Sequence, residues 1–337
     1  MRRLVLHIGS HKTGTTTLQS ALMRGKRQGL LGGWSYLHAG LRVDFNTLVG
    51  TKGMGAGMHT VLKWPFFERR MEHAAREGMQ DVVISSEMLF WLDDATQIAA
   101  LAERLRLEFD EIRIVAYLRR QDQLALSHRK QVVMGRAAYQ FYGAQLQALP
   151  RYAPHMLRYF DYAGKLAKWE QIFGADSITV RRFGKADLKG GDTVADFWSI
   201  LGLAPPQGLN RKNVAWSRAQ LLAGLWLRQR GYPSDAFVPL VKQIEDPEPL
   251  LPSQAQAQAF LAPFLEQNAV LAQRYDPAGP ENYFGMDVSR YPEASNLQAA
   301  PPQDLAALET AVQARMAEQG LEKQLLNPAD GPAGLPT

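Results

Sequence analysis

The first apolar segment of the chain ends in a turn that carries a lysine, two glycines and several hydroxyl groups. The residues of this turn are Gly9, Ser10, His11, Lys12, Thr13, Gly14, Thr15, Thr16 and Thr17. The run before it is typical of a buried strand, and the helical spacing of Leu18, Ala21 and Leu22 predicts a helix after it. A strand, a glycine turn and a helix together aim backbone N–H groups and the positive end of the helix at an anion. Lys12 adds a charge that can reach a phosphate or sulfate oxygen, so we predict an anion-binding loop.

The order of residues in this loop differs from that of the common nucleotide loop. A Walker A loop carries its lysine after the second glycine, followed by a serine or threonine for magnesium. Here Lys12 precedes Gly14, and no Gly-Lys pair follows Gly9 at the required distance. The alternative to anion binding is an ordinary strand–turn–helix in which Thr16 and Gln19 form a capping box.

A second group of polar residues follows a later apolar run. Arg119 comes directly after the expected strand 112–118, and Ser127 follows eight residues later on the next helix. Arg119 offers a planar fork for an oxyanion, and Ser127 offers a hydroxyl one to two turns into the helix. Arg120 is not equivalent, because Gln121 and Asp122 beside it indicate a solvated start to that helix.

Together, the Lys-Thr-Gly-Thr-Thr loop and the arginine–serine pair resemble the two signatures of sulfotransferases that use 3′-phosphoadenosine 5′-phosphosulfate (PAPS). The resemblance is to bacterial, carbohydrate-sulfotransferase-like members, and it covers about residues 3–230. It implies that the loop residues Lys12, Thr13, Gly14, Thr15, Thr16 and Thr17 hold the 5′-phosphosulfate. It also implies that Arg119 and Ser127 bind the 3′-phosphate, that no metal is required, and that 3′,5′-ADP is the product. The segment Arg211-Lys212-Asn213 is similar to the late basic segment that closes on the 3′-phosphate, although Asn213 replaces the glycine usual in cytosolic members.

The same resemblance implies a catalytic base at the end of the strand Asp81–Glu87. Many carbohydrate sulfotransferases place a glutamate there and cytosolic members a histidine, so Glu87 is expected to accept the proton of an acceptor hydroxyl. A carboxylate at the end of a buried strand is expected to have a raised pKa. An ion pair or a helix cap is the alternative role for Glu87, and His11 is the rival base. Lys12 is expected to neutralise the charge that builds on the bridging oxygen as 3′,5′-ADP leaves.

Strands and helices must alternate to bring these residues together. Strands are expected at 4–9, 34–37, 81–87, 112–118 and 177–183, and helices at 16–30, 61–77, 95–108, 121–135, 162–173, 194–201 and 218–230. Such alternation predicts an α/β fold with a central parallel sheet flanked by helices, three layers in all, which the resemblance makes P-loop-like. Ligands bind at the carboxyl ends of the strands in these sheets, so the loop, Glu87 and Arg119 are expected on one rim.

The chain is expected to divide into an α/β domain over 1–230 and a helical extension over 231–337 that packs on it. Prolines punctuate the extension, a helix is expected over 254–274, and the last residues are expected to fray. A helix over 303–326 is expected to dock either on the domain or on another subunit, giving a homo-oligomer. Aromatic and cationic side chains alternate over 137–162. They form either a platform for a sugar or, as we favour, a cap packed over the sheet.

Composition limits the remaining classes of function. The chain has 337 residues, no cysteine and a net charge of +5, which excludes disulfides, thiolate metal sites and a cysteine nucleophile. The first apolar run is too short for a secretory signal, and no stretch approaches the ~20 apolar residues of a membrane span. We therefore expect a soluble, cytoplasmic protein without a transmembrane segment. The mild positive charge suits an anionic ligand, whereas nucleic acid would require a denser basic stripe.

The sequence therefore predicts sulfuryl transfer from PAPS to a hydroxyl of a small molecule, most simply on a carbohydrate or glycolipid. A P-loop kinase or NTPase is the first alternative, and it requires magnesium and the Walker order that the loop lacks. A non-catalytic binder of adenosine bisphosphates is the second alternative, in which replacing Glu87 by glutamine would be silent.

Overall fold

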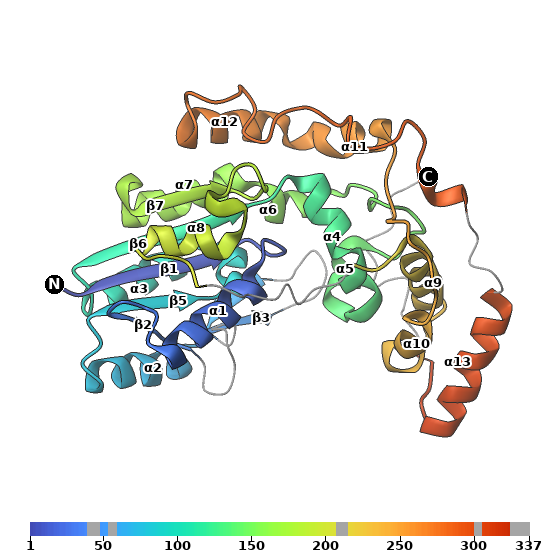
Figure 1. The fold of residues 1–337 in the computed structure, drawn as a ribbon, viewed down its shortest axis with the longest axis horizontal. Coiled ribbons are helices and arrows are strands. Elements are labelled where there is room, and N and C mark those ends of the chain that lie inside the picture. The colour runs from blue at the N-terminus through green and yellow to red at the C-terminus, as the bar shows by residue number, and fades with distance from the viewer. Residues whose placement is uncertain (39–47, 53–58, 207–214, 300–304, 324–337) are drawn as a thin grey trace.

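Five parallel strands form the centre of the molecule in the computed structural model, which describes residues 1–38, 48–52, 59–206, 215–299 and 305–323 (Figure 1). Their order in the sheet is β2-β5-β1-β6-β7, and every neighbouring pair is parallel. The strands span Arg3–Gly9 (β1), Trp34–Tyr36 (β2), Asp81–Ser85 (β5), Glu111–Leu118 (β6) and Ile178–Arg182 (β7). The predicted parallel α/β sheet is confirmed.

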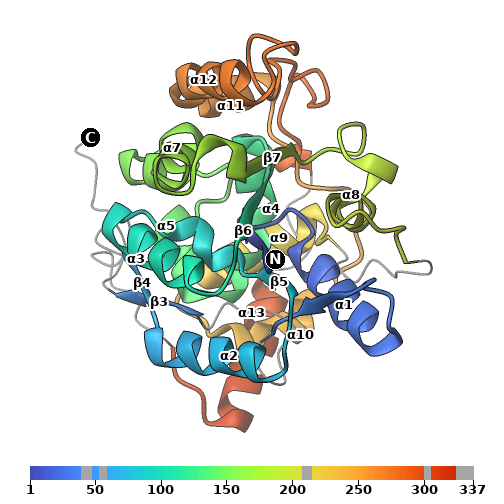
Figure 2. The ribbon, with the colours of Figure 1, turned by 90° about the vertical axis from the view of Figure 1, so that its left-hand side faces the viewer.

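Helices cover both faces of this sheet and make three layers. Figure 2 shows α1 (Thr15–Gln28) and α8 (Thr193–Ile200) on one side, and α3 (Ala95–Arg106) and α7 (Tyr162–Phe173) on the other. Successive residues of a strand point to opposite faces. Accordingly, Val5 of β1 packs in the cluster with α1 and α8, whereas Leu4 and Leu6 pack in the cluster with α3 and α7.

Local signals place most of the remaining helices as predicted. The side chain of Asp94 caps α3 by accepting from the Thr96 N–H, and Ser217 and Gln220 form a capping box at α9. Gly174, with φ of 92°, ends α7. The other helices of this part are α2 (Trp64–Arg76), α4 (Gln121–Met134), α5 (Arg136–Tyr142), α6 (Leu157–Phe160) and α9 (Arg218–Gln229).

One predicted helix begins later than expected. Residues 59–62 belong to β4 (His59–Leu62), which pairs antiparallel with β3 (Val49–Lys52), and the helix starts only at Trp64. The β-branched Thr60 and Val61 favour the strand, and Pro65 suits the first turn of the helix. The glycine-rich residues 53–58 lie outside the described residues.

The C-terminal extension packs on the α/β core through several helices. These are α10 (Ser234–Val241), α11 (Gln254–Leu261), α12 (Leu265–Tyr275) and α13 (Leu305–Gln319). In Figure 1, α11 and α12 lie along one side of the molecule while α13 lies beside α10. The single helix predicted over 254–274 is interrupted by a 3₁₀ turn at Ala262–Phe264, because Pro263 has no N–H to donate. Buried residues of the extension, such as Phe264 and Leu271, belong to the apolar cluster that also contains Leu4 and Leu6 of β1. Within the described residues, no helix combines the length and apolar character that crossing a membrane requires.

Candidate functional site

The loop between β1 and α1 lies where the direction of the chain connections reverses. The chain leaves β1 toward β2 on one side of the sheet and leaves β6 toward β7 on the other side. Such a reversal opens a crevice at the carboxyl ends of the two strands, where open α/β sheets bind ligands. Ser10 ties the loop to the end of β6, because its N–H donates to the Tyr117 carbonyl at 2.8 Å and its hydroxyl donates to the same oxygen at 2.9 Å.

The backbone of the loop explains its glycines. Gly9 has φ of 108° and Gly14 has φ of 80°, a region that favours glycine, and Lys12 is also left-handed at 61°. A Cβ on Gly9 would lie 3.1 Å from Glu87 Cα, and one on Gly14 would lie 2.9 Å from Thr193 Oγ1. The loop is therefore built for close approach to both Glu87 and α8.

The threonines of the loop divide between structural and exposed positions. Thr13 is buried and donates from Oγ1 to the Ser10 carbonyl at 2.6 Å, so its hydroxyl serves the turn itself. Thr15 is also buried, Thr17 is half-buried and Thr16 is exposed. Gly14 is the N-cap of α1 and no side chain caps the helix, so the capping box predicted as the alternative does not form. The side chain of Gln19 turns inward instead, because Glu87 and Ser85 offer it acceptors.

Lys12 lies among other cations. Its Nζ donates to Gln131 Oε1 on α4 at 2.8 Å. Burial, and to a smaller extent the positive charges of Arg119 and Lys130, lower the pKa of Lys12 to about 8. A partly desolvated lysine that other cations repel is a place where an anion binds favourably.

Arg119 reaches the loop from the end of β6. Its Nη1 donates to the Lys12 carbonyl at 3.0 Å, and its guanidinium lies 5.4 Å from the centre of the Phe183 ring. Its Nε is buried, and within the described residues it has no hydrogen-bond partner. Burial is the main cause that lowers the pKa of Arg119. The two predicted anion-binding groups are therefore in contact.

Of the other predicted phosphate ligands, Ser127 lies within the described residues, whereas Arg211 and Lys212 do not. Ser127 is half-buried in the second turn of α4, the helix that also carries Gln131. Arg120 differs from the prediction, because it is buried rather than solvated: its Nε and Nη2 donate to Asp122 at 2.8 and 2.9 Å. The prediction was wrong because the residues that cover Arg120 come from the C-terminal extension.

Glu87 follows β5 and begins the 3₁₀ helix Glu87–Trp91. Its Oε2 accepts a hydrogen bond from Gln19 Nε2 at 2.8 Å, and the same Nε2 donates to Ser85 Oγ at 3.3 Å. His7, inside β1, contacts Ser85 Oγ through Nδ1 at 2.8 Å, and burial lowers its pKa to about 4. Gln19 thus fixes one oxygen of the Glu87 carboxylate at the rim of the sheet.

His11 is held by Tyr159. The Tyr159 hydroxyl lies 2.8 Å from His11 Nδ1 and accepts from the His11 N–H at 3.3 Å. Among the described residues, the acceptor for the Tyr159 hydroxyl is His11 Nδ1. Nδ1 therefore carries no proton, and the proton of the neutral imidazole is on Nε2. Burial lowers the pKa of His11 to about 4, against the smaller opposing effect of Glu87. His11 is therefore a neutral ring whose Nδ1 lone pair is already engaged.

Most aromatic residues of the 137–162 segment form a buried cap, as favoured from the sequence. Tyr159, Phe160 and Tyr162 are completely buried, and Tyr142 stacks on His128 with ring centres 5.3 Å apart. Trp91, which precedes this segment, lies 4.1 Å from the Tyr159 ring and 6.2 Å from the His11 ring. Aromatic rings therefore lie against the side of the His11 ring that faces Trp91 and Tyr159.

Sequence reasoning missed four residues that position the site. Gln19 holds Glu87, Gln131 holds Lys12, Tyr159 holds His11, and Thr193 donates from Oγ1 to the Thr13 carbonyl at 3.0 Å. Asp192 caps α8 by accepting from the N–H groups of residues 194 and 195, which leaves the Thr193 hydroxyl to bind the loop. Gln19 lies on the same face of the helix as the apolar Leu18 and Leu22. This position in the sequence could have indicated that its side chain points into the protein and binds a buried partner.

Two further observations concern ligands and cavities. Among the described residues, no group of three or more His, Asp or Glu side chains is placed to hold a metal ion. A hollow of 890 Å³ lies between β7 and α12, lined by residues such as Thr179 and Gln273. None of the predicted site residues lines it, so it is separate from the loop.

Comparison with known proteins gives limited matches. No family model matches the chain. Over 151 residues the chain is 31% identical to an uncharacterized protein from Archaeoglobus fulgidus, a match covering 44% of this chain and 37% of that protein. The chain thus matches well under half of this relative's length. A crystal structure of a sulfotransferase from Alicyclobacillus acidocaldarius aligns with 82% of this chain and 98% of its own, at 15% identity and a TM-score of 0.43.

Proposed function

We propose that the protein transfers a sulfuryl group from PAPS to an acceptor hydroxyl, on a carbohydrate or glycolipid. The observation that carries this proposal is the hydrogen bond between Arg119 Nη1 and the Lys12 carbonyl. This bond joins the arginine at the end of β6 to the loop that follows the neighbouring strand β1. Open α/β sheets bind nucleotides at such a position. A donor with a phosphate at each end of its adenosine needs two groups of positive charge side by side.

The residues of the loop fit the phosphosulfate end of this donor. PAPS supplies the sulfuryl group and departs as 3′,5′-ADP. The N–H groups of the uncapped first turn of α1 bind the 5′-phosphate, assisted by Gly14 and the hydroxyls of Thr15, Thr16 and Thr17. Lys12 stabilises the charge on the bridging oxygen, which increases as the loose transition state of such transfers is reached. Arg119, whose Nε has no partner among the described residues, and Ser127 bind the 3′-phosphate.

Glu87 is the better placed of the two candidate bases. Gln19 holds the Glu87 carboxylate and orients it at the rim of the sheet, where the carboxylate accepts the proton of the acceptor hydroxyl. His11 is less suitable, because its Nδ1 accepts from Tyr159 and its Nε2 carries a proton. A neutral Nε2–H is instead a donor that can orient an acceptor oxygen.

Aromatic rings support a sugar as the acceptor. Trp91 is half-buried, and its ring lies near those of His11, Tyr159 and Phe141. The apolar face of a pyranose packs well on such rings, while its hydroxyls need polar neighbours such as Glu87 and His11.

Calorimetry with 3′,5′-ADP and 5′-AMP, with and without magnesium, tests the donor assignment. We expect 3′,5′-ADP to bind without magnesium, and Arg119→Ala to weaken that binding by about 10- to 100-fold while 5′-AMP changes little. Arg113→Ala is the matched control, because this partly exposed arginine lies on the same strand and pairs with Glu111. Equal losses for both nucleotides, or binding that requires magnesium, would overturn the proposal. Transfer of label from PAPS to a panel of saccharides then identifies the acceptor.

A further inference from the structure

The C-terminal extension binds the turn that carries Arg119 and comprises residues 119–122. Asn268 of α12 and Gln121 of α4 are buried and exchange two side-chain hydrogen bonds, of 2.8 and 3.1 Å. Asn268 also holds the next part of the extension, because its carbonyl accepts from the Tyr283 N–H at 3.0 Å. Two buried amides satisfy each other's hydrogen bonds only in one relative position, because no water can replace a lost bond. The Asn268–Gln121 pair therefore fixes the position of α12 on this turn.

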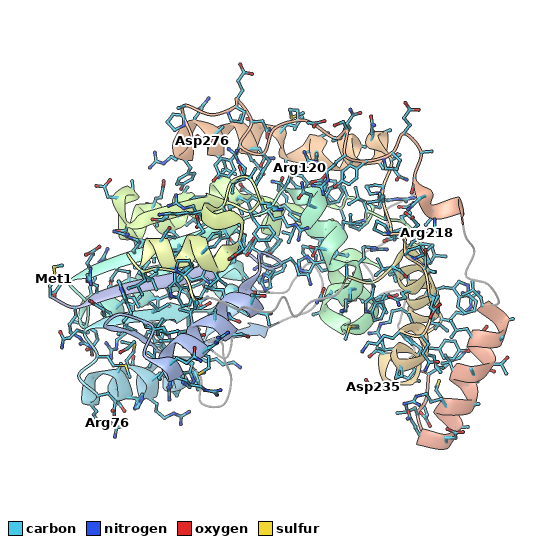
Figure 3. All side chains as sticks on the ribbon, viewed as in Figure 1. Met1, Arg76, Arg120, Arg218, Asp235 and Asp276 are labelled. Carbon is cyan, nitrogen blue, oxygen red and sulfur yellow. The ribbon has the colours of Figure 1, made fainter. Side chains whose placement is uncertain are left out.

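The segment Asp287–Tyr291 adds two further contacts to the same turn. The Asp287 carbonyl accepts from Arg120 Nη1 at 2.6 Å, and the Tyr291 hydroxyl donates to Asp122 Oδ2 at 2.8 Å. Asp122 also pairs with Arg120 inside this contact, and Figure 3 shows Arg120 between α4 and the α11–α12 pair. Three consecutive residues after Arg119 therefore hydrogen-bond with residues of the extension or with each other.

Arg290 lies in this anchored segment and remains exposed. Its guanidinium is 5.6 Å from the centre of the Tyr291 ring, and within the described residues no carboxylate forms an ion pair with it. Arg290 lies between Asp287 and Tyr291, which hydrogen-bond with the first and third residues after Arg119. After burial, its positive charge is also one of the causes that lower the pKa of Arg119. The extension thus brings another cation to the turn that carries Arg119.

We propose that the segment Asp287–Tyr291 is part of the nucleotide site, with Arg290 as a further ligand of the phosphate that Arg119 binds. Tyr291 is a positioning residue, because it holds Asp122 and so the turn from which Arg119 projects. This inference rests on the proposed function, since the phosphate is the 3′-phosphate of PAPS or 3′,5′-ADP. The C-terminal extension then contributes directly to discrimination between 3′-phosphorylated and plain adenosine nucleotides.

Calorimetry of the full chain with 3′,5′-ADP and 5′-AMP tests the role of Arg290. Arg290→Ala is expected to weaken 3′,5′-ADP binding about fivefold and 5′-AMP binding less than twofold, and Arg290→Lys to keep most of the affinity. The difference is expected to shrink at high salt, because the group is exposed. Arg230→Ala is the matched control: this arginine is also exposed and packs over a ring, that of Trp226, at 3.6 Å.

Tyr291→Phe tests the positioning role. It is expected to lower the ratio of 3′,5′-ADP to 5′-AMP affinity, whereas Tyr275→Phe, which removes a 2.6 Å hydrogen bond between α12 and Glu170, is expected to leave the ratio unchanged. Unaltered nucleotide binding by Arg290→Ala, with a loss in Arg119→Ala, would overturn this inference and leave the proposed function intact. Absence of 3′,5′-ADP binding in the unaltered protein would overturn both.

Discussion

Under the proposed function, the lowered pKa of Lys12 is expected to make nucleotide binding dependent on pH. With a pKa of about 8 in the free protein, Lys12 is about nine-tenths charged at pH 7 and about one-tenth charged at pH 9. A bound phosphate favours the charged form and returns the pKa toward its usual value. The complex therefore binds more protons than the free protein above pH 8, and affinity must fall as the pH rises.

The size of the effect follows from the same shift. Below about pH 7 the contribution of Lys12 is fully present, and above pH 8 it is lost by about one tenfold step per pH unit. Between pH 8 and pH 10 the Kd for 3′,5′-ADP is expected to rise by about 40-fold, with uptake of close to one proton per site. Calorimetry from pH 7 to 9.5, in two buffers of different ionisation enthalpy, measures both quantities.

Variants at Lys12 separate its titration from that of other groups. Lys165 also has a pKa lowered to about 8, chiefly by burial, so the unaltered protein alone does not identify the group. Lys12→Met is expected to bind weakly at pH 7 and to lose the dependence on pH, whereas Lys12→Arg keeps its charge throughout. A Kd that stays constant from pH 7 to 9.5, without proton uptake, would refute the reasoning.

Four other substitutions, two of them combined in a double variant, test the remaining contacts. Glu87→Gln is expected to lower sulfuryl transfer by about 100- to 10,000-fold while 3′,5′-ADP binding in the calorimeter is unchanged, and normal turnover would exclude Glu87 as the base. Gln19→Leu removes the donor that orients Glu87, so kcat is expected to fall about 10- to 100-fold with little change in KM for the donor, and an unchanged kcat would contradict this role. Asn268→Leu leaves the buried Gln121 amide unpaired and is expected to lower the free energy of unfolding in urea by about 1–3 kcal/mol. The double variant with Gln121→Leu is expected to recover most of that loss, and simple additivity would show that the pair does not act as a unit.

Local patterns were sufficient to predict the sheet and the position of the loop. Runs such as Asp81–Ser85 are apolar because both faces of the strand are covered, and the predicted parallel order follows from the alternation of strands and helices. Asp94 and Gly174 mark helix ends through local chemistry, which the sequence displays directly.

The errors occur where a residue acts through a partner far away in the chain. Gln19 looks like part of a capping box until Glu87, 68 positions later, is known to accept from it. Thr193 has the right type for a cap, but the loop carbonyl that it contacts is 180 positions earlier. A short-range pattern cannot show such contacts, because the competing partner is absent from the window that is read.

Two adjacent arginines at the end of β6, Arg119 and Arg120, lie in different electrostatic surroundings. The guanidinium of Arg120 is matched by the Asp122 carboxylate and by the Asp287 carbonyl, so its charge is neutralised within the protein. The guanidinium of Arg119 instead contacts a backbone carbonyl and a ring, and among the described residues no carboxylate forms an ion pair with it. Burying a charge without a counter-ion is costly, and placing Lys12 beside it adds repulsion. The anchored turn holds Arg119 in this unfavourable position, and under the proposed function the 3′-phosphate is expected to supply the missing negative charge.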